Sequence, residues 1–183
     1  DLSDALKPDA SAVINYFHSQ GKQVILLSGD APNIVRSLAD SMGIDDAQGG
    51  MLPHQKLEFV QQLQSAGARV MMVGDGMNDA AVLRAADVSF AMGSGAALAQ
   101  SHADAVLLSA KLSSLIDAAE AAKACMKVIR QNLLWATIYN LLAIPAAALG
   151  LLAPWMAGLG MSVSSAGVVI NALRLQRLPS RSR

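Results

Sequence analysis

The sequence is poor in cysteine and in charge, and each shortage excludes a class of protein. Cys125 is the only cysteine among 183 residues, so the chain forms no intramolecular disulfide, which fits a reducing compartment for its soluble part. Charged residues make up 15% of the chain and cancel to a net charge of zero, so we expect no nucleic-acid partner. The chain starts with aspartate and no signal peptide precedes it, which predicts a fragment of a longer protein.

Hydrophobic residues are abundant instead, and they are unevenly distributed. They make up 53% of the chain, which is too apolar for an ordinary soluble protein. Up to about Ser109 polar and apolar residues are mixed as in a globular domain, whereas the chain is almost entirely apolar from Leu133 onward. Leu133–Leu152 and Trp155–Leu173 each have the roughly 20 apolar residues that cross a bilayer core of about 30 Å. Two membrane-spanning helices joined by a tight turn are therefore expected.

The first hundred residues alternate helical patterns with short apolar runs. The predicted helices are Asp9–Gln20, Pro32–Met42, His54–Ala66 and Asn78–Ala86, and the predicted strands are Gln23–Leu27, Arg69–Val73, Val88–Ala91 and Ala105–Leu108. Gly21, Gly43 and Gly67 stand just past three of the helices, where helices commonly end. This alternation predicts an α/β fold with a Rossmann-like parallel sheet covered by helices on both faces.

Two loops that combine glycine with aspartate follow the first two predicted strands. They are Ser28-Gly29-Asp30 and Gly74–Asp79, the second of which reads Gly-Asp-Gly-Met-Asn-Asp. In parallel sheets ligands bind beyond the carboxyl ends of the strands, and glycine lets the backbone approach an anion closely. The loops therefore predict a site for a phosphoryl group.

Four side chains in and near these loops suit phosphoryl transfer. Asp75 and Asp79 lie four residues apart where a helix begins, so both can reach one Mg²⁺, which prefers carboxylate, water and phosphate oxygens. Ser28 offers a hydroxyl to a phosphoryl oxygen, and Lys56 offers the positive charge that a phosphoryl transition state needs. Taken singly, each motif is also compatible with a turn or a helix cap. Their combination favours the phosphoryl site.

Polar side chains inside the two apolar stretches are further candidates. Tyr139 and Asn140 lie in the first stretch, and Met161 and Ser165 share one face of the second. Polar groups at such depth are commonly functional, and a thioether suits Cu(I), whereas Ca²⁺ or Mg²⁺ would call for acids that neither stretch contains. An alternative is a close-packed helix surface of small residues in which Met161 fills space. That surface would comprise Gly158, Gly160, Ser162, Ser164, Ser165 and Gly167.

Basic residues flank the apolar stretches on both sides. Lys123, Lys127 and Arg130 precede them, and Arg174, Arg177, Arg181 and Arg183 follow them. The positive-inside rule then places residues 1–131 and the C-terminal tail in the cytoplasm. Membrane lipid is the expected surrounding of the two stretches.

The loop motifs resemble those of the haloacid-dehalogenase superfamily, and the run from Val73 to Gly93 resembles P-type ATPases in particular. Asp4–Pro8 is similar to the hinge motif of these pumps. The resemblance implies that Asp75 binds Mg²⁺, that Asp79 supports it and that Asn78 helps to hold the phosphorylation loop. It also implies ATP as the phosphoryl donor. The catalytic set is then Ser28, Gly29, Asp30, Lys56, Asp75, Asn78 and Asp79.

The nucleophile of that family, in Asp-Lys-Thr-Gly-Thr, does not occur in this sequence. We therefore predict that the 183-residue chain alone does not hydrolyse ATP and needs the remaining N-terminal part of the same pump. The resemblance implies four parts. These are the C-terminal part of a cytoplasmic phosphorylation domain (1–109), a connecting helix (110–131), a transmembrane helix pair (132–175) and a basic cytoplasmic tail (176–183).

The second half resembles the last two helices of heavy-metal P-type ATPases selective for Cu(I). The similar segments are Tyr139-Asn140, Met161–Ser165 and Asn171–Leu175. The resemblance implies that Tyr139, Asn140, Met161 and Ser165 line the site of the transported Cu(I), together with a Cys-Pro-Cys on an earlier helix. It further implies a multi-pass protein of the bacterial inner membrane and a copper chaperone as a partner. Zinc and cadmium pumps carry a lysine and an aspartate in these helices, and neither is present.

Three other functions remain compatible with the sequence. The first is a P-type pump for another metal such as zinc, cadmium or silver. The second is a membrane-anchored phosphatase of the same superfamily, and the third is a non-catalytic remnant that only occupies the membrane.

Overall fold

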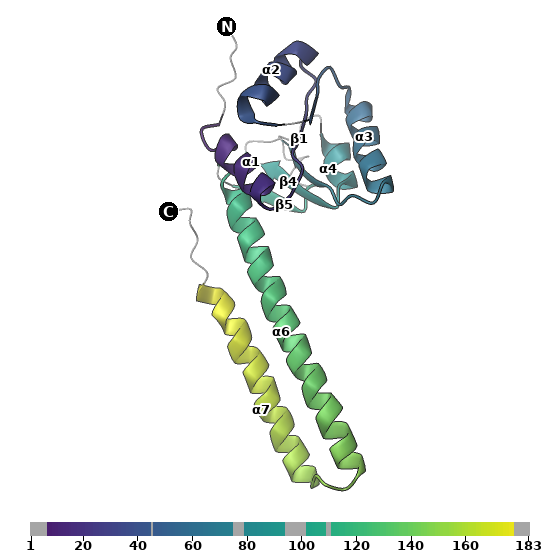
Figure 1. The fold of residues 1–183 in the computed structure, drawn as a ribbon, viewed down its shortest axis with the longest axis vertical. Coiled ribbons are helices and arrows are strands. Elements are labelled where there is room, and N and C mark those ends of the chain that lie inside the picture. The colour runs from purple at the N-terminus through teal and green to yellow at the C-terminus, as the bar shows by residue number, and fades with distance from the viewer. Residues whose placement is uncertain (1–6, 45, 75–78, 94–101, 109–110, 178–183) are drawn as a thin grey trace. The chain divides into compact units, whose positions relative to one another are not determined.

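The computed structural model describes residues 7–44, 46–74, 79–93, 102–108 and 111–177. The chain divides into two compact units, Asp1–Ile116 and Asp117–Arg183, and each is described by itself. The first unit contains α1 (Ala10–Ser19), β1 (Ile25–Leu27), α2 (Pro32–Met42), β2 (Asp46–Gln48), α3 (Pro53–Ser65), β3 (Met71–Gly74), α4 (Ala80–Ala85), β4 (Val88–Met92) and β5 (Ala105–Leu107). Figure 1 labels these elements.

The predicted alternation of strand and helix is confirmed, with one addition. Helix α2 has the predicted bounds, while α1 and α3 differ from the prediction by a residue at each end. Strand β2 is absent from the predicted elements because Asp46–Gln48 lacks the apolar run that marks a buried strand. It forms nevertheless, because each of its residues pairs with one residue of β1.

All described strand pairs are parallel, as predicted, but the strands form two sheets. Strand β1 pairs with β2, and the second sheet has the order β3-β4-β5. In the second sheet Gly74, the last residue of β3, pairs with Ala91 of β4. The loop Gly74–Asp79 therefore leaves the sheet at the carboxyl ends of its strands, where parallel sheets bind ligands.

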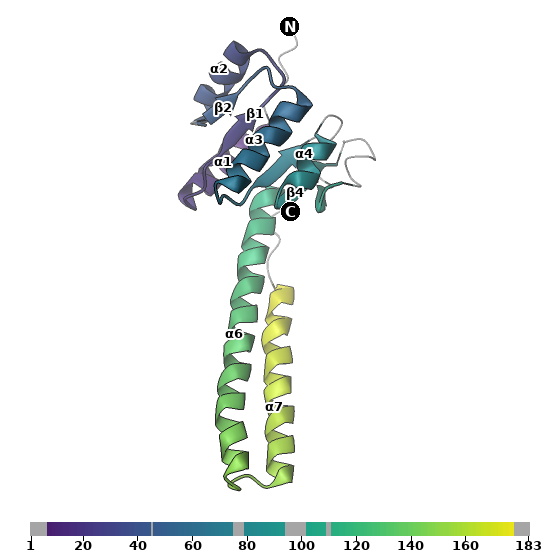
Figure 2. The ribbon, with the colours of Figure 1, turned by 90° about the vertical axis from the view of Figure 1, so that its right-hand side faces the viewer.

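Helix α1 contributes adjacent side chains to two hydrophobic clusters. Val13 packs with Leu107 and other residues from β4, β5 and the start of α6, while Ile14 packs with Ala39 and Ile44. Adjacent residues on a helix point about 100° apart, so one helix can serve two neighbouring clusters. Figure 2 shows α1, α2 and α3 around the strands.

A third cluster fastens α4 to the second sheet. Leu83 is fully buried and packs with Ala91 of β4 and Met72 of β3. Burial of a leucine side chain stabilises a fold by about 1.5–3 kcal/mol. This contact fixes α4, and with it Asp79, the residue that directly precedes the helix.

The second unit is a helix pair made of α6 (Ser114–Ala148) and α7 (Pro154–Leu173), followed by a short 3-10 helix (Arg174–Arg177). The first turn of α6 belongs to the first unit. Figures 1 and 2 both show α6 and α7 side by side and antiparallel. Many large apolar side chains on both helices are exposed, among them Leu133, Leu141, Leu142, Ile144, Leu159, Val163 and Ile170.

One helix in the described part of the chain is long and apolar enough, by length and composition, to cross a membrane. It is the 22-residue segment Trp155–Gln176, which includes the predicted second span. The predicted first span, Leu133–Leu152, forms the second half of α6, which ends earlier, at Ala148. That half also begins next to the polar pair Gln131-Asn132 and contains Asn140.

Candidate functional site

Two predicted catalytic residues, Lys56 and Asp79, form an ion pair in the first unit. The Lys56 Nζ atom donates to the Asp79 Oδ1 atom at 2.9 Å. Each side chain is only 12% exposed, so the pair is largely shielded from solvent. Lys56 lies in α3 and Asp79 directly precedes α4, and the pair therefore joins these two helices.

The Asp79 side chain does not cap its own helix. Asp79 occupies the N-cap position of α4, yet it makes no capping hydrogen bond through its side chain. An aspartate at this position commonly stabilises a helix by about 1 kcal/mol through such a bond. Here the carboxylate contacts Lys56 instead, which disfavours the alternative that Asp79 is only a helix cap.

The second carboxylate oxygen of Asp79 suits a hard cation. Among the described residues no hydrogen bond is made to Oδ2. Gly74 lies beside it, and a Cβ atom there would stand 3.3 Å from Oδ2, so the glycine leaves this oxygen accessible. Mg²⁺ binds carboxylate oxygens, and the residues present therefore fit the predicted ion. Asp75 and Asn78, the other predicted residues of this loop, lie outside the described residues.

Ser28, Gly29 and Asp30 form a closed turn after β1. The Ser28 hydroxyl donates to the Asp30 Oδ2 atom at 2.7 Å and accepts the Asp30 backbone N–H at 3.2 Å. The hydroxyl proton predicted to reach a phosphoryl oxygen is thus held by Asp30. Ser28 can bind a phosphoryl group only by exchanging this hydrogen bond for a new one.

The segment after β2 supports this turn and continues into α3. The Gly50 backbone N–H donates to the Asp30 carbonyl at 2.6 Å, and the Met51 N–H donates to the Ser28 carbonyl at 3.0 Å. Gly49 permits the approach, because a Cβ atom there would lie 2.6 Å from the Pro32 Cα atom. Within the described ranges no hydrogen bond or ion pair joins Ser28 or Asp30 to the Lys56–Asp79 pair.

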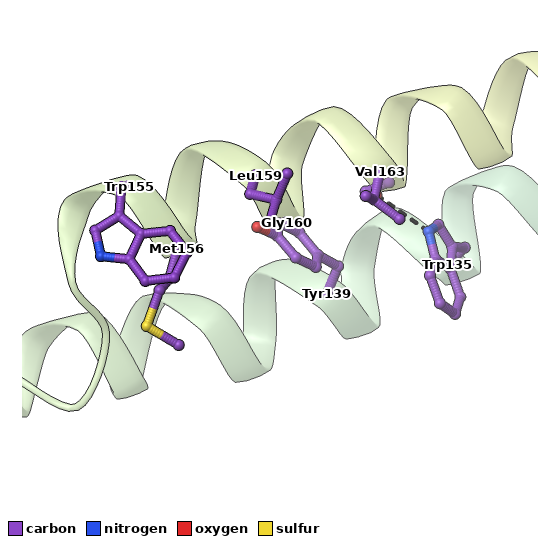
Figure 3. A pocket seen from close by; sticks show the side chains of 8 residues that line it. Trp135, Tyr139, Trp155, Met156, Leu159, Gly160 and Val163 are labelled. Atoms are coloured by element: carbon purple, nitrogen blue, oxygen red, sulfur yellow. Dashed lines mark hydrogen bonds between the residues drawn. The ribbon is translucent and has the colours of Figure 1, made fainter.

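The helix pair positions Tyr139 between its two helices. The Tyr139 hydroxyl donates to the Ala157 carbonyl at 3.3 Å. Its ring lies against Gly160, where a Cβ atom would stand 2.8 Å from the Tyr139 hydroxyl oxygen (Figure 3). Tyr139 is therefore part of the contact between α6 and α7, and Gly160 makes room for it.

Half-buried residues at intervals of three and four define the contacting faces of the two helices. On α6 from Asn132 onward they are Asn132, Ala136, Tyr139, Ala143 and Ala146, and on α7 they are Ala157, Gly160, Ser164, Val168 and Asn171. We refer to these ten residues as the seam. Intervals of three and four bring residues to one face of a helix, which explains why these positions lose exposure together.

The three other predicted metal ligands lie beside the seam. Asn140 follows Tyr139 of the seam, and Met161 follows Gly160. A step of one residue turns about 100° around each helix, and in antiparallel helices these turns lead to the same side of the pair. Asn140, Met161 and Ser165 thus share one side of the pair, all three exposed. Met161 is 66% exposed, so it does not lie between α6 and α7.

The opposite side of the helix pair carries an apolar groove of about 470 Å³. Figure 3 shows its lining, which comprises Trp135, Tyr139, Trp155, Met156, Leu159, Gly160, Val163 and Ser164. The Trp135 indole N–H donates to the Ser164 hydroxyl at 3.1 Å across the two helices. The groove and this bond were not predicted, although the interval of four between Trp135 and Tyr139 indicates a shared helix face.

Known proteins resemble this chain in both of its units. Residues 1–87 match the haloacid dehalogenase-like hydrolases. A copper-exporting P-type ATPase of Staphylococcus aureus (strain JH9) is 44% identical to this chain over 177 residues. The match covers 97% of this chain but only 22% of the relative, so the chain spans about a fifth of the length of the curated relatives it matches.

Solved structures give the same assignment. A zinc-transporting PIB-type ATPase in the E2.Pi state is 35% identical, with a TM-score of 0.90 over 94% of this chain and 28% of that one. The catalytic domain of the CPx-ATPase CopB-B is 33% identical, with a TM-score of 0.58 over 61% of this chain and 44% of that one. The similarity includes both the α/β unit and the helix pair, so this chain is similar to part of the heavy-metal P-type ATPases along nearly its whole length.

Proposed function

We propose that this chain is the C-terminal part of an ATP-driven pump that exports Cu(I). The observation that carries the proposal is the presence of two sites on one chain. A largely buried Lys56–Asp79 pair stands at the carboxyl edge of a parallel sheet, and a helix pair whose apolar stretches contain no acids presents Asn140 and Met161 on one side. The identity of 44% to a copper-exporting relative extends over both.

In the phosphoryl site Asp75 and Asp79 would hold Mg²⁺. When bound, this ion neutralises charge on the phosphoryl group transferred from ATP. Lys56 orients Asp79 through the 2.9 Å contact and adds its own positive charge to the site. Ser28 transfers its hydroxyl hydrogen bond from Asp30 to a phosphoryl oxygen, with Gly29 allowing the close approach. The phosphorylated aspartate is supplied by the N-terminal part of the pump, whose loop Asn78 helps to hold.

In the metal site the ligand chemistry suits a soft monovalent ion. Met161 supplies a thioether sulfur, which favours Cu(I), and Asn140 and Ser165 supply neutral oxygens from the same side of the pair. The Tyr139 hydroxyl donates a hydrogen bond to the Ala157 carbonyl, so its oxygen keeps a lone pair for the ion. Phosphorylation and its reversal would then switch access to this site between the two sides of the membrane.

The proposal places the second half of α6 and all of α7 in the bacterial inner membrane. The exposed apolar side chains on both helices and the span Trp155–Gln176 support this placement. Residues 1–131 and the C-terminal tail lie in the cytoplasm, where ATP and a copper chaperone would be available. The domain bounds at 109, 131 and 175 belong to the same proposal.

A pump for zinc is the second candidate, because a zinc-transporting structure matches with a TM-score of 0.90. The residues favour Cu(I) over zinc, since neither apolar stretch contains the cysteine, histidine or acid that zinc prefers. A membrane-anchored phosphatase is less well supported, because the similarity to metal pumps extends through the helix pair.

The test is metal-stimulated ATP hydrolysis by the full-length protein. Cu(I) should stimulate hydrolysis, and Met161→Ala and Asn140→Ala should abolish most of that stimulation. Met156→Ala is the matched control, because Met156 is an exposed methionine of the same helix that lines the opposite groove. Stimulation by Zn²⁺ alone, or equal effects at Met156 and Met161, would overturn the assignment of Cu(I).

A further inference from the structure

A cluster of amide side chains joins the two helices at the end of the pair that is far from the connecting turn. We propose that Asn171 is a positioning residue that sets the register of α7 against α6. It thereby holds Met161 at the level of Asn140. The inference rests on the proposed metal site, but its structural part can be tested without metal.

Both the nitrogen and the oxygen of the Asn171 amide make hydrogen bonds. Its Nδ2 atom donates to the Asn132 Oδ1 atom at 2.9 Å and to the Gln131 Oε1 atom at 3.3 Å, both on α6. Its Oδ1 atom accepts from the Arg174 Nη1 atom at 3.5 Å. Asn132 and Asn171 are both half-buried seam residues, so their bond is partly shielded from solvent.

Elsewhere along the pair, two hydrogen bonds cross between the helices, from the Tyr139 hydroxyl to the Ala157 carbonyl and from the Trp135 indole to the Ser164 hydroxyl. Asn171 supplies the link farthest from the connecting turn, and the remaining seam residues add little to the register.

The remaining seam residues are mainly small, such as Ala136 and Ala143, and they present few side-chain ridges to a neighbouring helix. In a bilayer, apolar contact between helices has little advantage over contact with lipid, so directional hydrogen bonds specify the packing. A buried asparagine is an established means of selecting one register in paired helices.

The position of the cluster makes the register matter for the metal site. At one end of the pair the turn after Ala148 connects the helices, and at the other end Asn171 joins them. Asn140 and Met161 lie between these two links. A slip by one helical turn would displace Met161 along the pair by about 5.4 Å, more than a metal-ligand distance. Loss of the Asn171 bonds should therefore weaken metal binding without touching a ligand.

The experiment uses the intact pump with Asn171→Leu, Asn132→Leu and the double variant. Nitroxide labels on encoded keto amino acids at the exposed positions Thr137 and Ala166 report the distance between the helices. We expect both single variants to broaden or shift the distance distribution, and the double variant to match them. The metal concentration for half-maximal ATP hydrolysis should rise by about threefold to tenfold, the range that one interhelical hydrogen bond in a membrane provides.

Ser162→Ala is the matched control, because the Ser162 hydroxyl bonds to the Gly158 carbonyl within its own helix. It should leave the distances and the metal response unchanged. Phosphorylation of each variant by inorganic phosphate checks that the cytoplasmic unit is folded. An unchanged distance distribution in Asn171→Leu would overturn the inference. So would a double variant whose increase in half-maximal metal concentration equals the product of the increases in the two single variants. A shifted distance in a protein that never responds to metal would refute the proposed pump instead and leave the role of Asn171 in place.

Discussion

Replacement of Lys56 by methionine tests the environment of the Lys56–Asp79 pair. The change keeps the length of the side chain and removes its charge, which leaves the Asp79 carboxylate buried without a partner. Removal of one member of a buried ion pair costs about 3–5 kcal/mol. Because both side chains retain 12% exposure, we expect the lower end of this range, about 3 kcal/mol.

Amide hydrogen exchange of the chain in detergent micelles measures this effect locally. A loss of about 3 kcal/mol corresponds to exchange faster by about 100-fold for the most protected amides of α3 and α4. The double variant Lys56→Met/Asp79→Leu should recover most of the protection, because an apolar pair no longer leaves a buried charge.

Arg36→Met provides the comparison, since Arg36 pairs with Asp40 at 3.4 Å on the surface, with 64% and 63% exposure. Exposed pairs of this kind contribute about 0.3–0.5 kcal/mol, so exchange should rise by no more than about threefold. If Lys56→Met resembled Arg36→Met, or if the double variant were no more protected than the single one, the reasoning from burial would be wrong.

Two further predictions concern the second sheet. The Val70 backbone N–H, together with two side-chain donors, lowers the pKa of Asp87 from 3.8 to about 2, so the ionised form is favoured in the folded state. The stability that this carboxylate contributes is present above about pH 4 and is lost as the pH falls toward 2. In urea unfolding measured against pH, the free energy of unfolding should therefore fall less steeply below pH 4 in Asp87→Asn than in the unmodified chain. Ser89→Ala should lower the free energy of unfolding in urea by about 1–3 kcal/mol, because the buried hydroxyl donates to the Asp104 carboxylate at 2.9 Å and accepts the Asp104 backbone N–H at 3.0 Å. An unchanged unfolding midpoint in Ser89→Ala would contradict that assignment.

The α/β character of the first unit could be predicted because its signals are local. Apolar runs of strand length and helical intervals ended by glycine predict most elements to within a few residues. Strand β2 escaped prediction because its three residues carry no apolar pattern, and it exists only through pairing with β1. The division into two sheets likewise depends on contacts between distant segments.

In the candidate sites, too, some features could be predicted from the sequence and others depend on the fold. Lys56 and Asp79 were predicted to belong together, yet only the fold shows that their side chains meet and that Asp79 leaves its helix uncapped to do so. Asn132 was not predicted at all, because an asparagine next to an apolar stretch has no distinctive signal until its partner, Asn171, is opposite it.

Residue types, their order and their local periodicity were sufficient to predict the fold class, the phosphoryl motifs and the apolar helices. Which side chains meet could be seen in the fold alone. Ser28 bonds to Asp30, Tyr139 lies between the helices, and Met161 is exposed on the same side of the helix pair as Asn140. Hydrogen bonds and burial depend on distances of a few ångströms between residues far apart in the chain, and no local pattern encodes these distances.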